Sequence, residues 1–440
     1  MKKGWEIKKL GEVCIVERGS SPRPIKKYQT DSKDGVNWIK IGDTKGVDKY
    51  IYTTKEKITK EGAEKSRYVK EGDFILSNSM SFGNPYIMKT DGYIHDGWFV
   101  FRLPDFLDKD YFYYLLTSPN VQKQIQSLGA GAIVKNISGD LVKKVDITYP
   151  KSLPEQQRIV SILDEAFAAI DKAKANAEQN LKNAKELFES YLQGVFEKKG
   201  DGWEEKKLNE IGNAQTGTTP KTSEKENFGD FIPFIKPADV DFTGSGDIRY
   251  DNNGLSEVGL KKGRKMKIGS TLMVCIGATI GKVGFAEMSV SCNQQINSLT
   301  VKNDYEPKFI YYAMTSKNFQ EKVLLEGKGA QATLPIINKS KWENLTINFP
   351  KSRTEQKSYV EKFDALKVET QKMEAIYRKK MDDLEELKKS ILQKAFAGEL
   401  NMSELGFDGL KDDRILEKDK TEILQSSNPK NHNPDKRIKG

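Results

Sequence analysis

The chain has 440 residues, 37% of them hydrophobic and 31% charged, which excludes a single small domain and a disordered polymer and allows two or three ordinary cores. Its 72 Lys and Arg exceed its 63 Asp and Glu, and the net charge of +9 favours polyanionic partners, although a plain basic surface would look the same. Three cysteines and two histidines cannot build a disulfide framework or a zinc site at a recognised spacing.

The amino terminus, from Met1 to Trp5, lacks the apolar core of a signal peptide. No run of residues approaches the roughly 18 apolar residues of a membrane span. We therefore expect a cytoplasmic, reduced protein that does not associate with a membrane.

Residues 1–150 predict a mixed α/β domain. Short apolar runs such as Asp73-Phe74-Ile75-Leu76 alternate with Gly, Pro, Asn and Asp, a pattern typical of short strands and turns. The domain ends at the aromatic-proline step Tyr149-Pro150.

Residues 151–200 predict one long helix. Between Glu155 and Glu197 there is no proline and one glycine, so at ~1.5 Å per residue the helix could approach ~60 Å. Its apolar residues follow alternating steps of three and four, with Lys174 in the one polar slot, which is a coiled-coil pattern. These residues are Val160, Leu163, Phe167, Ile170, Ala177, Leu181, Ala184, Phe188, Tyr191 and Val195.

Residues 201–400 repeat this organisation. The segment Gly4-Trp5-Glu6 reappears as Gly202-Trp203-Glu204, an offset of 198, and the offset reaches 200 at Phe349-Pro350. Further matched pairs are Gly19-Ser20-Ser21-Pro22 with Gly217-Thr218-Thr219-Pro220, Trp38-Ile39-Lys40 with Phe234-Ile235-Lys236, and Tyr113-Tyr114 with Tyr311-Tyr312. A duplicated fold is therefore expected, with a second domain over 201–350 and a second helix over 351–400.

The second helix carries the same stepping in Phe363, Leu366, Met373, Tyr377, Leu384, Leu387 and Ile391, interrupted by Thr370 and Lys380. An apolar stripe of this length needs a partner, and we expect the two helices to form an antiparallel coiled-coil pair between the two domains. The alternative is that the stripes are core faces of two helical domains. The polar residues 401–440 are expected to be a disordered tail.

Each helix begins with a distinctive motif after the aromatic-proline step. The first copy reads Ser152-Leu153-Pro154-Glu155-Gln156-Gln157-Arg158-Ile159-Val160, and the second contains Glu355-Gln356-Lys357-Ser358-Tyr359-Val360. Together with the duplication, this resembles the specificity subunits of type I restriction-modification enzymes, which have two target-recognition domains and two spacer helices. The resemblance extends to about Leu400. The second copy has Arg353-Thr354 in place of Leu153-Pro154, which we interpret as drift at a helix start.

The resemblance implies a subunit without catalytic residues or a cofactor of its own. Each recognition domain would read one half of a bipartite site in double-stranded DNA, and the helices would fix the gap between the halves. The helices would also bind two modification subunits, adenine methyltransferases that use S-adenosylmethionine, and the complex would include restriction subunits. Half-sites on one face of DNA lie about one turn (~34 Å) apart, so a stiff spacer suits this task.

Motifs for chemistry fail when they are tested individually. Gly277-Ala278-Thr279-Ile280-Gly281-Lys282-Val283 has three residues between its glycines and Val after Lys, so a turn is favoured over a phosphate loop. Pro104-Asp105 has no following Asp/Glu-x-Lys before Pro150, as a nuclease would need. A methyltransferase would need an Asn/Asp-Pro-Pro-aromatic motif, which is absent. His95 has no companion ligand and is read as a structural histidine.

Loops that combine amide or hydroxyl side chains with Lys and Arg are the candidate DNA contacts, since the former read bases and the latter bind phosphates. In the first domain these residues are Ser20, Ser21, Arg23, Lys26, Lys27, Asn78, Ser79, Lys135 and Asn136. In the second they are Thr218, Thr219, Lys221, Thr279, Lys282, Asn293, Gln294, Gln295, Lys328 and Gln331. The different loops predict different half-sites.

Charge also separates the two copies. Residues 1–150 hold 25 basic against 19 acidic residues, and residues 201–350 hold 19 against 18, so the first domain is expected to grip phosphate harder. Three alternatives stay open: the recognition part of a differently organised restriction-modification system, a self-contained DNA methyltransferase or nuclease, and a basic coiled-coil scaffold.

Overall fold

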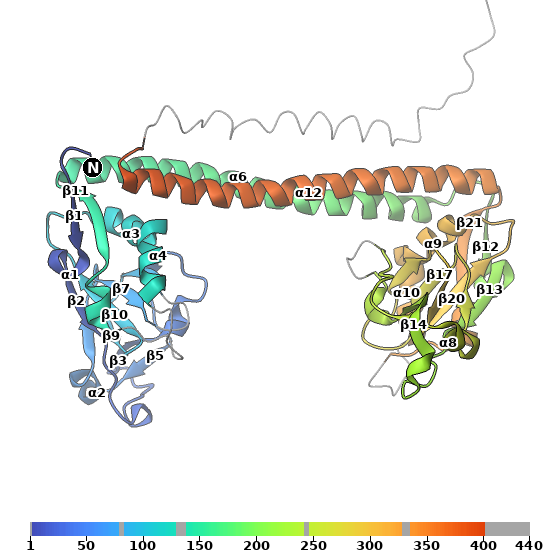
Figure 1. Ribbon diagram of the computed structural model, residues 1–440, viewed down its shortest axis with the longest axis horizontal. Coiled ribbons are helices and arrows are strands. Elements are labelled where there is room, and N and C mark those ends of the chain that lie inside the picture. Colours follow the sequence, from blue (N-terminus) through green and yellow to red (C-terminus); the bar gives the residue numbers. More distant parts are fainter. Residues whose placement is uncertain (1, 79–82, 129–137, 242–245, 328–334, 401–440) are drawn as a thin grey trace, which may run out of the picture. The chain divides into compact units, whose positions relative to one another are not determined.

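The computed structural model describes residues 2–78, 83–128, 138–241, 246–327 and 335–400. The chain divides into two compact units, which are described separately. Of the described residues, the first contains 2–178 and 378–400, and the second contains Gln179–Tyr377. Each unit therefore combines one globular domain with parts of two long helices (Figure 1).

The globular domain of the first unit is mixed α/β, as the sequence predicts. A ribbon pairs β1 with β11 antiparallel and brings the two ends of the domain together. One sheet has the order β2-β10-β7-β8-β4 and the other β5-β3-β9-β6. Among the described strands of this domain, only β3 with β9 and β4 with β8 pair in parallel. The strands are β1 Trp5–Lys9, β2 Ile15–Arg18, β3 Val36–Ile39, β4 Tyr50–Ile51, β5 Glu56–Ile58, β6 Arg67–Val69, β7 Phe74–Ser77, β8 Pro85–Met88, β9 Gly92–Ile94, β10 Trp98–Arg102 and β11 Asp146–Pro150.

The domain of the second unit repeats these sheets in the same order, except that β4 has no counterpart among its described strands. Its ribbon is β12–β21, and its two sheets run β13-β20-β17-β18 and β15-β14-β19-β16. The parallel pairing of β14 with β19 corresponds to that of β3 with β9. The strands are β12 Trp203–Lys207, β13 Gly212–Thr216, β14 Phe228–Ile235, β15 Gly254–Leu255, β16 Lys265–Met266, β17 Thr271–Val274, β18 Val283–Phe285, β19 Val290–Cys292, β20 Ile296–Val301 and β21 Thr346–Pro350. The expectation of two copies of one fold is confirmed.

Short helices complete each domain. In the first they are α1 Leu10–Val13, α2 Lys60–Glu64, α3 Lys109–Thr117, α4 Pro119–Leu128 and α5 Gly139–Val142, with 3-10 turns η1 Ile25–Lys27 and η2 Ile41–Thr44. In the second they are α7 Leu208–Ile211, α8 Glu257–Lys262, α9 Pro307–Thr315, α10 Lys317–Gly327 and α11 Lys339–Glu343, with η3 Lys225–Asn227 and η4 Pro237–Asp239.

Two long helices follow the domains, α6 (Leu153–Lys198) and α12 (Arg353–Ala397). Both begin at the same point of the repeat, so the loss of proline in the second copy leaves the helix start in place. Most of the seam residues are buried: Leu163, Phe167, Ile170, Ala177 and Ala184 on α6, and Phe363, Leu366, Tyr377, Leu384 and Ile391 on α12.

Side-chain pairs show that the helices run antiparallel within the first unit. The ammonium of Lys174 lies 2.5 Å from the carboxylate of Glu385, and that of Lys388 lies 3.1 Å from Asp171. From the first ion pair to the second, the residue number falls from 174 to 171 on α6 and rises from 385 to 388 on α12. The two helices therefore run antiparallel. The polar slot at Lys174 is thus filled by an ion pair. The expected antiparallel helix pair is confirmed.

Each helix also ends in the core of the domain that does not precede it. Phe396, in the last turn of α12, packs on Tyr111 of the first domain with ring centroids 5.3 Å apart. Phe196, near the end of α6, packs on Phe309 and Trp203 of the second domain at 5.5 and 5.9 Å. The apolar stripes therefore both pair the helices and close the two domain cores. Within the described residues, no helix is long and apolar enough to cross a membrane.

Candidate DNA-binding loops

Two loops of the first domain lie side by side, at the adjoining ends of the paired strands β2 and β10. The Gly-Pro loop, residues 19–22, follows β2, and the tip loop, residues 95–97, joins β9 to β10. The backbone N–H of Gly19 donates to the carbonyl of Trp98 at 2.8 Å, and that of Ser20 to Ile94 at 3.2 Å. A Cβ on Gly19 would lie 2.0 Å from the carbonyl oxygen of His95, so only glycine allows this approach.

The second domain builds the same arrangement 198 residues later. Its Gly-Pro loop is 217–220 and its tip loop is 293–295. Gly217 donates to Ile296 at 2.9 Å and Thr218 to Cys292 at 2.9 Å, and a Cβ on Gly217 would lie 2.1 Å from the carbonyl oxygen of Asn293. The strand register repeats as well, because Arg18 faces Phe99 and Thr216 faces Asn297. Residues of the two sites can therefore be equated one by one.

In the first domain the two loops join through a hydroxyl and a carboxylate. The Oγ of Ser21 donates to Oδ1 of Asp96 at 2.6 Å, and the guanidinium of Arg23 lies 3.7 Å from Oδ2. The side chain of Arg23 is 82% exposed and that of Asp96 47%. The hydrogen bond from Ser21 lowers the pKa of Asp96, which keeps the carboxylate ionised.

In the second domain an amide replaces the carboxylate. The Oγ1 of Thr219 donates to Oε1 of Gln294 at 2.5 Å. Lys221, whose side chain is 81% exposed, stands where the first domain has Arg23, and its ammonium lies 3.6 Å from Glu224. Gln295 is fixed by its neighbour Asn293, since the amide of Asn293 donates to Oε1 of Gln295 at 2.9 Å. The tip of this loop cluster therefore presents a neutral amide where the first presents a carboxylate, while a cationic side chain stands in the Gly-Pro loop of both.

A third loop adjoins each tip loop. In the first domain the N–H of Asn78 donates to the carbonyl of Gly97 at 2.8 Å, and in the second Cys275 donates to Gln295 at 2.8 Å. The predicted turn between β17 and β18 is present, with positive φ at Gly277 and Gly281. Thr279 is exposed on this turn.

Other predicted residues have different environments. Lys26 and Lys27 are exposed in η1, directly after the Gly-Pro loop and Arg23. The hydroxyl of Ser20 donates to the carbonyl of Lys65 at 3.2 Å. Lys282 is half-buried, and its ammonium donates to the carbonyl of Asp241 at 3.2 Å. The structure thus brings residues of separate segments to one loop cluster in each domain.

Two of the predicted contacts need correction. Asn78 is 0% exposed and Asn293 9%, because both side chains turn inward beneath the loops, so neither presents its amide to a duplex. Asn293 serves instead to hold Gln295. Five further candidates, Ser79, Lys135, Asn136, Lys328 and Gln331, lie outside the described residues.

The sequence analysis did not select Asp96, and it read the neighbouring His95 as a structural histidine, which the contacts of the ring support. The Nδ1 of His95 accepts from the N–H of Gly97 at 2.9 Å, and its ring lies 6.2 Å from that of Trp38. Burial lowers the pKa of His95, so the ring is neutral and can accept this bond. The sequence offset between the two copies is 198 residues here, so the predicted contact Gln294 corresponds to Asp96 in the first domain.

The environment of the cysteines does not favour nucleophilic chemistry. Burial raises the pKa of each of the thiols of Cys14, Cys275 and Cys292 to about 12, so they stay protonated. Among the described residues, no group of three or more His, Cys, Asp or Glu side chains is placed to hold a metal ion.

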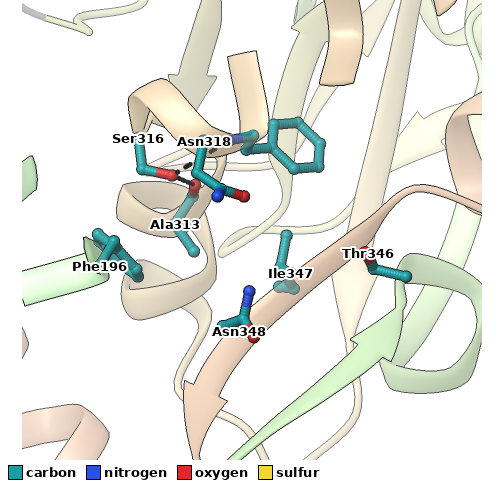
Figure 2. A pocket seen from close by; sticks show the side chains of 8 residues that line it. Phe196, Ala313, Ser316, Asn318, Thr346, Ile347 and Asn348 are labelled. Carbon is teal, nitrogen blue, oxygen red and sulfur yellow. Dashed lines mark hydrogen bonds between the residues drawn. The ribbon is translucent and has the colours of Figure 1, made fainter. Parts of the chain in front are cut away.

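A small pocket lies where the end of α6 meets the second domain. It has a volume of about 10 Å³, which is room for one water molecule. Figure 2 shows Phe196, Ala313 and Ile347 among the residues that line the pocket, with the Oγ of Ser316 donating to the carbonyl of Ala313 at 2.6 Å. The pocket is part of the helix junction and is too small for a substrate.

The family model for the type I restriction modification DNA specificity domain matches residues 2–182 and again 200–378. The MjaIX specificity subunit of Methanocaldococcus jannaschii, a type I restriction enzyme subunit, is 25% identical over 92% of this chain and 95% of its own length. The HindI specificity subunit of Haemophilus influenzae is 31% identical over 34% of this chain and 32% of its own.

Two solved structures share the fold. The HsdS subunit from Thermoanaerobacter tengcongensis is 20% identical, with a TM-score of 0.59 over 91% of this chain and 98% of its own. A chain from a structure describing complex assembly and conformational transition of the type I R-M system is 19% identical, with a TM-score of 0.74 over 91% of this chain and 99% of its own. Since the family model covers most of the sequence in two copies, the chain belongs to the type I restriction modification DNA specificity family.

Proposed function

We propose that each globular domain reads one half of a bipartite site in double-stranded DNA, and that α6 and α12 fix the gap between the halves. The chain is a specificity subunit, and the catalytic subunits of such systems are separate proteins. We assign methyl transfer from S-adenosylmethionine to two modification subunits that dock on the helices, and cleavage to restriction subunits. This chain then needs no cofactor and acts in the cytoplasm.

One observation carries this proposal. The two domains share a backbone frame, with the same register and the same Gly-Pro loop contacts, but present different side chains from it. Asp96 with Arg23 occupies the place of Gln294 with Lys221. A constant frame with variable tips suits two readers of different sequences, because phosphate contacts position a protein while side chains at base edges specify the sequence.

The domain limits follow from the same repeat. We propose residues 1–150 and 201–350 as the two recognition domains, with spacer helices over 151–200 and 351–400. Helices of 46 and 45 residues, paired and locked into both domain cores, are stiff enough to keep a gap constant.

The proposed contacts are the accessible members of the loop clusters. In the first domain they are Ser20, Ser21, Arg23, Lys26, Lys27 and Asp96. In the second they are Thr218, Thr219, Lys221, Thr279, Lys282, Gln294 and Gln295. Hydroxyl, amide and carboxylate groups in these sets suit base edges, and the exposed Lys and Arg side chains suit phosphates.

The test is to methylate DNA with the full chain and its methyltransferase partner, and to map the modified adenines. A bipartite motif with a fixed gap is expected. Replacing residues 1–150 by the recognition domain of another family member should change one half of that motif and keep the gap. A change in both halves, or in neither, would show that the domains do not read DNA independently.

A further inference from the structure

The tip residues Asp96 and Gln294 occupy one structural position. Each follows the residue whose carbonyl faces the loop glycine, and each accepts a hydrogen bond from the hydroxyl that stands two residues after that glycine. Arg23 lies beside Asp96, and Lys221 stands at the equivalent position of the second Gly-Pro loop, where its ammonium lies 3.6 Å from Glu224. The two positions share one backbone frame and present different chemistry.

The first domain presents an acceptor beside a donor. The hydroxyl of Ser21 donates to Oδ1 of Asp96, and Oδ2 lies 3.7 Å from the guanidinium of Arg23. At that distance both Oδ2 and the guanidinium can also bind a third group, such as the edge of a base pair. A carboxylate accepts from the N4 amino group of cytosine, and a guanidinium donates to O6 and N7 of guanine. In a G·C pair these two edges lie next to each other in the major groove.

The second domain presents an amide that is oriented by its neighbour. Thr219 donates to Oε1 of Gln294, which fixes the amide plane and leaves the second lone pair of that oxygen. Within the described part of the chain, the Nε2 group has no hydrogen-bond partner. A glutamine in this state can accept from N6 and donate to N7 of adenine.

Building on the proposed function, we infer that Asp96 and Gln294 are equivalent specificity-determining residues, one in each domain. Asp96, together with Arg23, specifies a G·C pair in one half-site. Gln294 specifies an A·T pair in the other. Ser21 and Thr219 are positioning residues, since their hydroxyls orient the reading groups.

The experiment exchanges this chemistry between the two domains. Asp96→Gln and the double variant Gln294→Asp with Lys221→Arg are prepared as full chains with the methyltransferase partner. DNA carrying randomised target positions is methylated, and the modified adenines are mapped. The ratio of methylation at G·C and A·T should shift by about tenfold or more at one position of one half-site, in opposite directions for the two variants, as expected for loss of a paired base contact.

Matched controls make the same charge changes at the far ends of β10 and β20. Asp105→Asn removes a carboxylate beyond β10, and Asn303→Asp adds one beyond β20; both residues are exposed. Neither control should change the motif. A tip variant can bind DNA without supporting methylation. As a second readout, each variant is therefore allowed to bind the unmethylated library, and the bound DNA is sequenced.

The outcomes distinguish a failure of the Asp96 and Gln294 assignment from a failure of the proposed function. Suppose that the wild-type motif is bipartite and that both tip variants keep it unchanged, in methylation or in bound DNA. This result overturns the assignment of Asp96 and Gln294 and leaves the proposed function of two DNA-reading domains intact. A wild-type motif that is not bipartite removes the function itself. A shift confined to the predicted half-site supports the assignment.

Discussion

Gln356 ties the second domain to its helix through Pro350. Its Nε2 donates to the carbonyl of Pro350 at 2.8 Å, and its Oε1 accepts from the backbone N–H of Glu306 at 2.8 Å. Gln156 repeats both bonds with Pro150 at 2.9 Å and the N–H of Asp108 at 2.7 Å. Both glutamines are 0% exposed. The Glu-Gln motif after the aromatic-proline step is therefore a structural joint.

Replacing Gln356 by Met should weaken this joint without leaving a large cavity. The carbonyl of Pro350 and the N–H of Glu306 would lose their partner, and an unsatisfied buried polar group costs about 1–3 kcal/mol. Hydrogen exchange under native conditions should show the loss in the second unit and not in the first. The control is Lys357→Met, at the exposed next position; equal destabilisation by both variants would contradict the role of Gln356.

Phe396→Ala should destabilise the first unit, although Phe396 follows the second domain in the sequence. The ring is 7% exposed and packs edge-on against Tyr111, and removing a buried phenylalanine costs about 3–5 kcal/mol. Amide protection should fall in residues 2–150 and persist in residues 201–350. Gln393→Ala, at an exposed position in the same region of α12, should leave both regions protected.

Gly19→Ala should disable the first reading loop. The added Cβ would lie 2.0 Å from a backbone oxygen, so the Gly-Pro loop must move away from the tip loop and carry Ser21 and Arg23 with it. We expect at least a tenfold loss of affinity for specific DNA, about 1.4 kcal/mol, measured by titration of the complex. Gly42→Ala is the control, because its Cβ would meet nothing within 4 Å. Equal affinities of the two variants would contradict the prediction.

Acid should weaken the first unit through His95. Burial holds the pKa of this ring below its ordinary value of 6.5, so between the two values the unfolded chain binds more protons than the folded one. The free energy of unfolding of this unit is therefore highest above pH 6.5 and falls as the pH drops from 6.5 toward the folded-state pKa. The free energy of unfolding should therefore fall less between pH 7.5 and pH 5.5 in the His95→Asn variant than in the wild type. Asparagine is chosen because Asn293 stands at the equivalent position of the second domain.

The repeat, the two domain folds and the helix pair could be predicted because each leaves a periodic or collinear signal. The collinear matches that start at Trp5 and Trp203 predicted two copies of one fold. The alternating steps of three and four in each long helix predicted an apolar stripe that needs a helical partner. The ion pair of Lys174 with Glu385 even explains the one polar slot in the seam.

The packing partner of each helix end could not be predicted. An apolar stripe predicts that a surface is buried, but it does not predict which surface packs against it. The sequence therefore did not indicate that Phe196 and Phe396 complete the domain cores. The burial of Asn78 and Asn293 was equally hidden, since an amide in a turn can face inward or outward. Asp96 was missed because a lone Asp before Gly looks like an ordinary turn, and only its alignment with Gln294 reveals the shared position.

The exchange of helix ends also sets the order in which the two cores can be completed during synthesis. The second domain and the helix segments that pack on it lie between Gln179 and Tyr377, so all of their residues are synthesised before the last turns of α12. The first domain, although synthesised earliest, still lacks Phe396 and Leu400 from its core at that stage. The amino-terminal half of the chain is consequently the last to be completed.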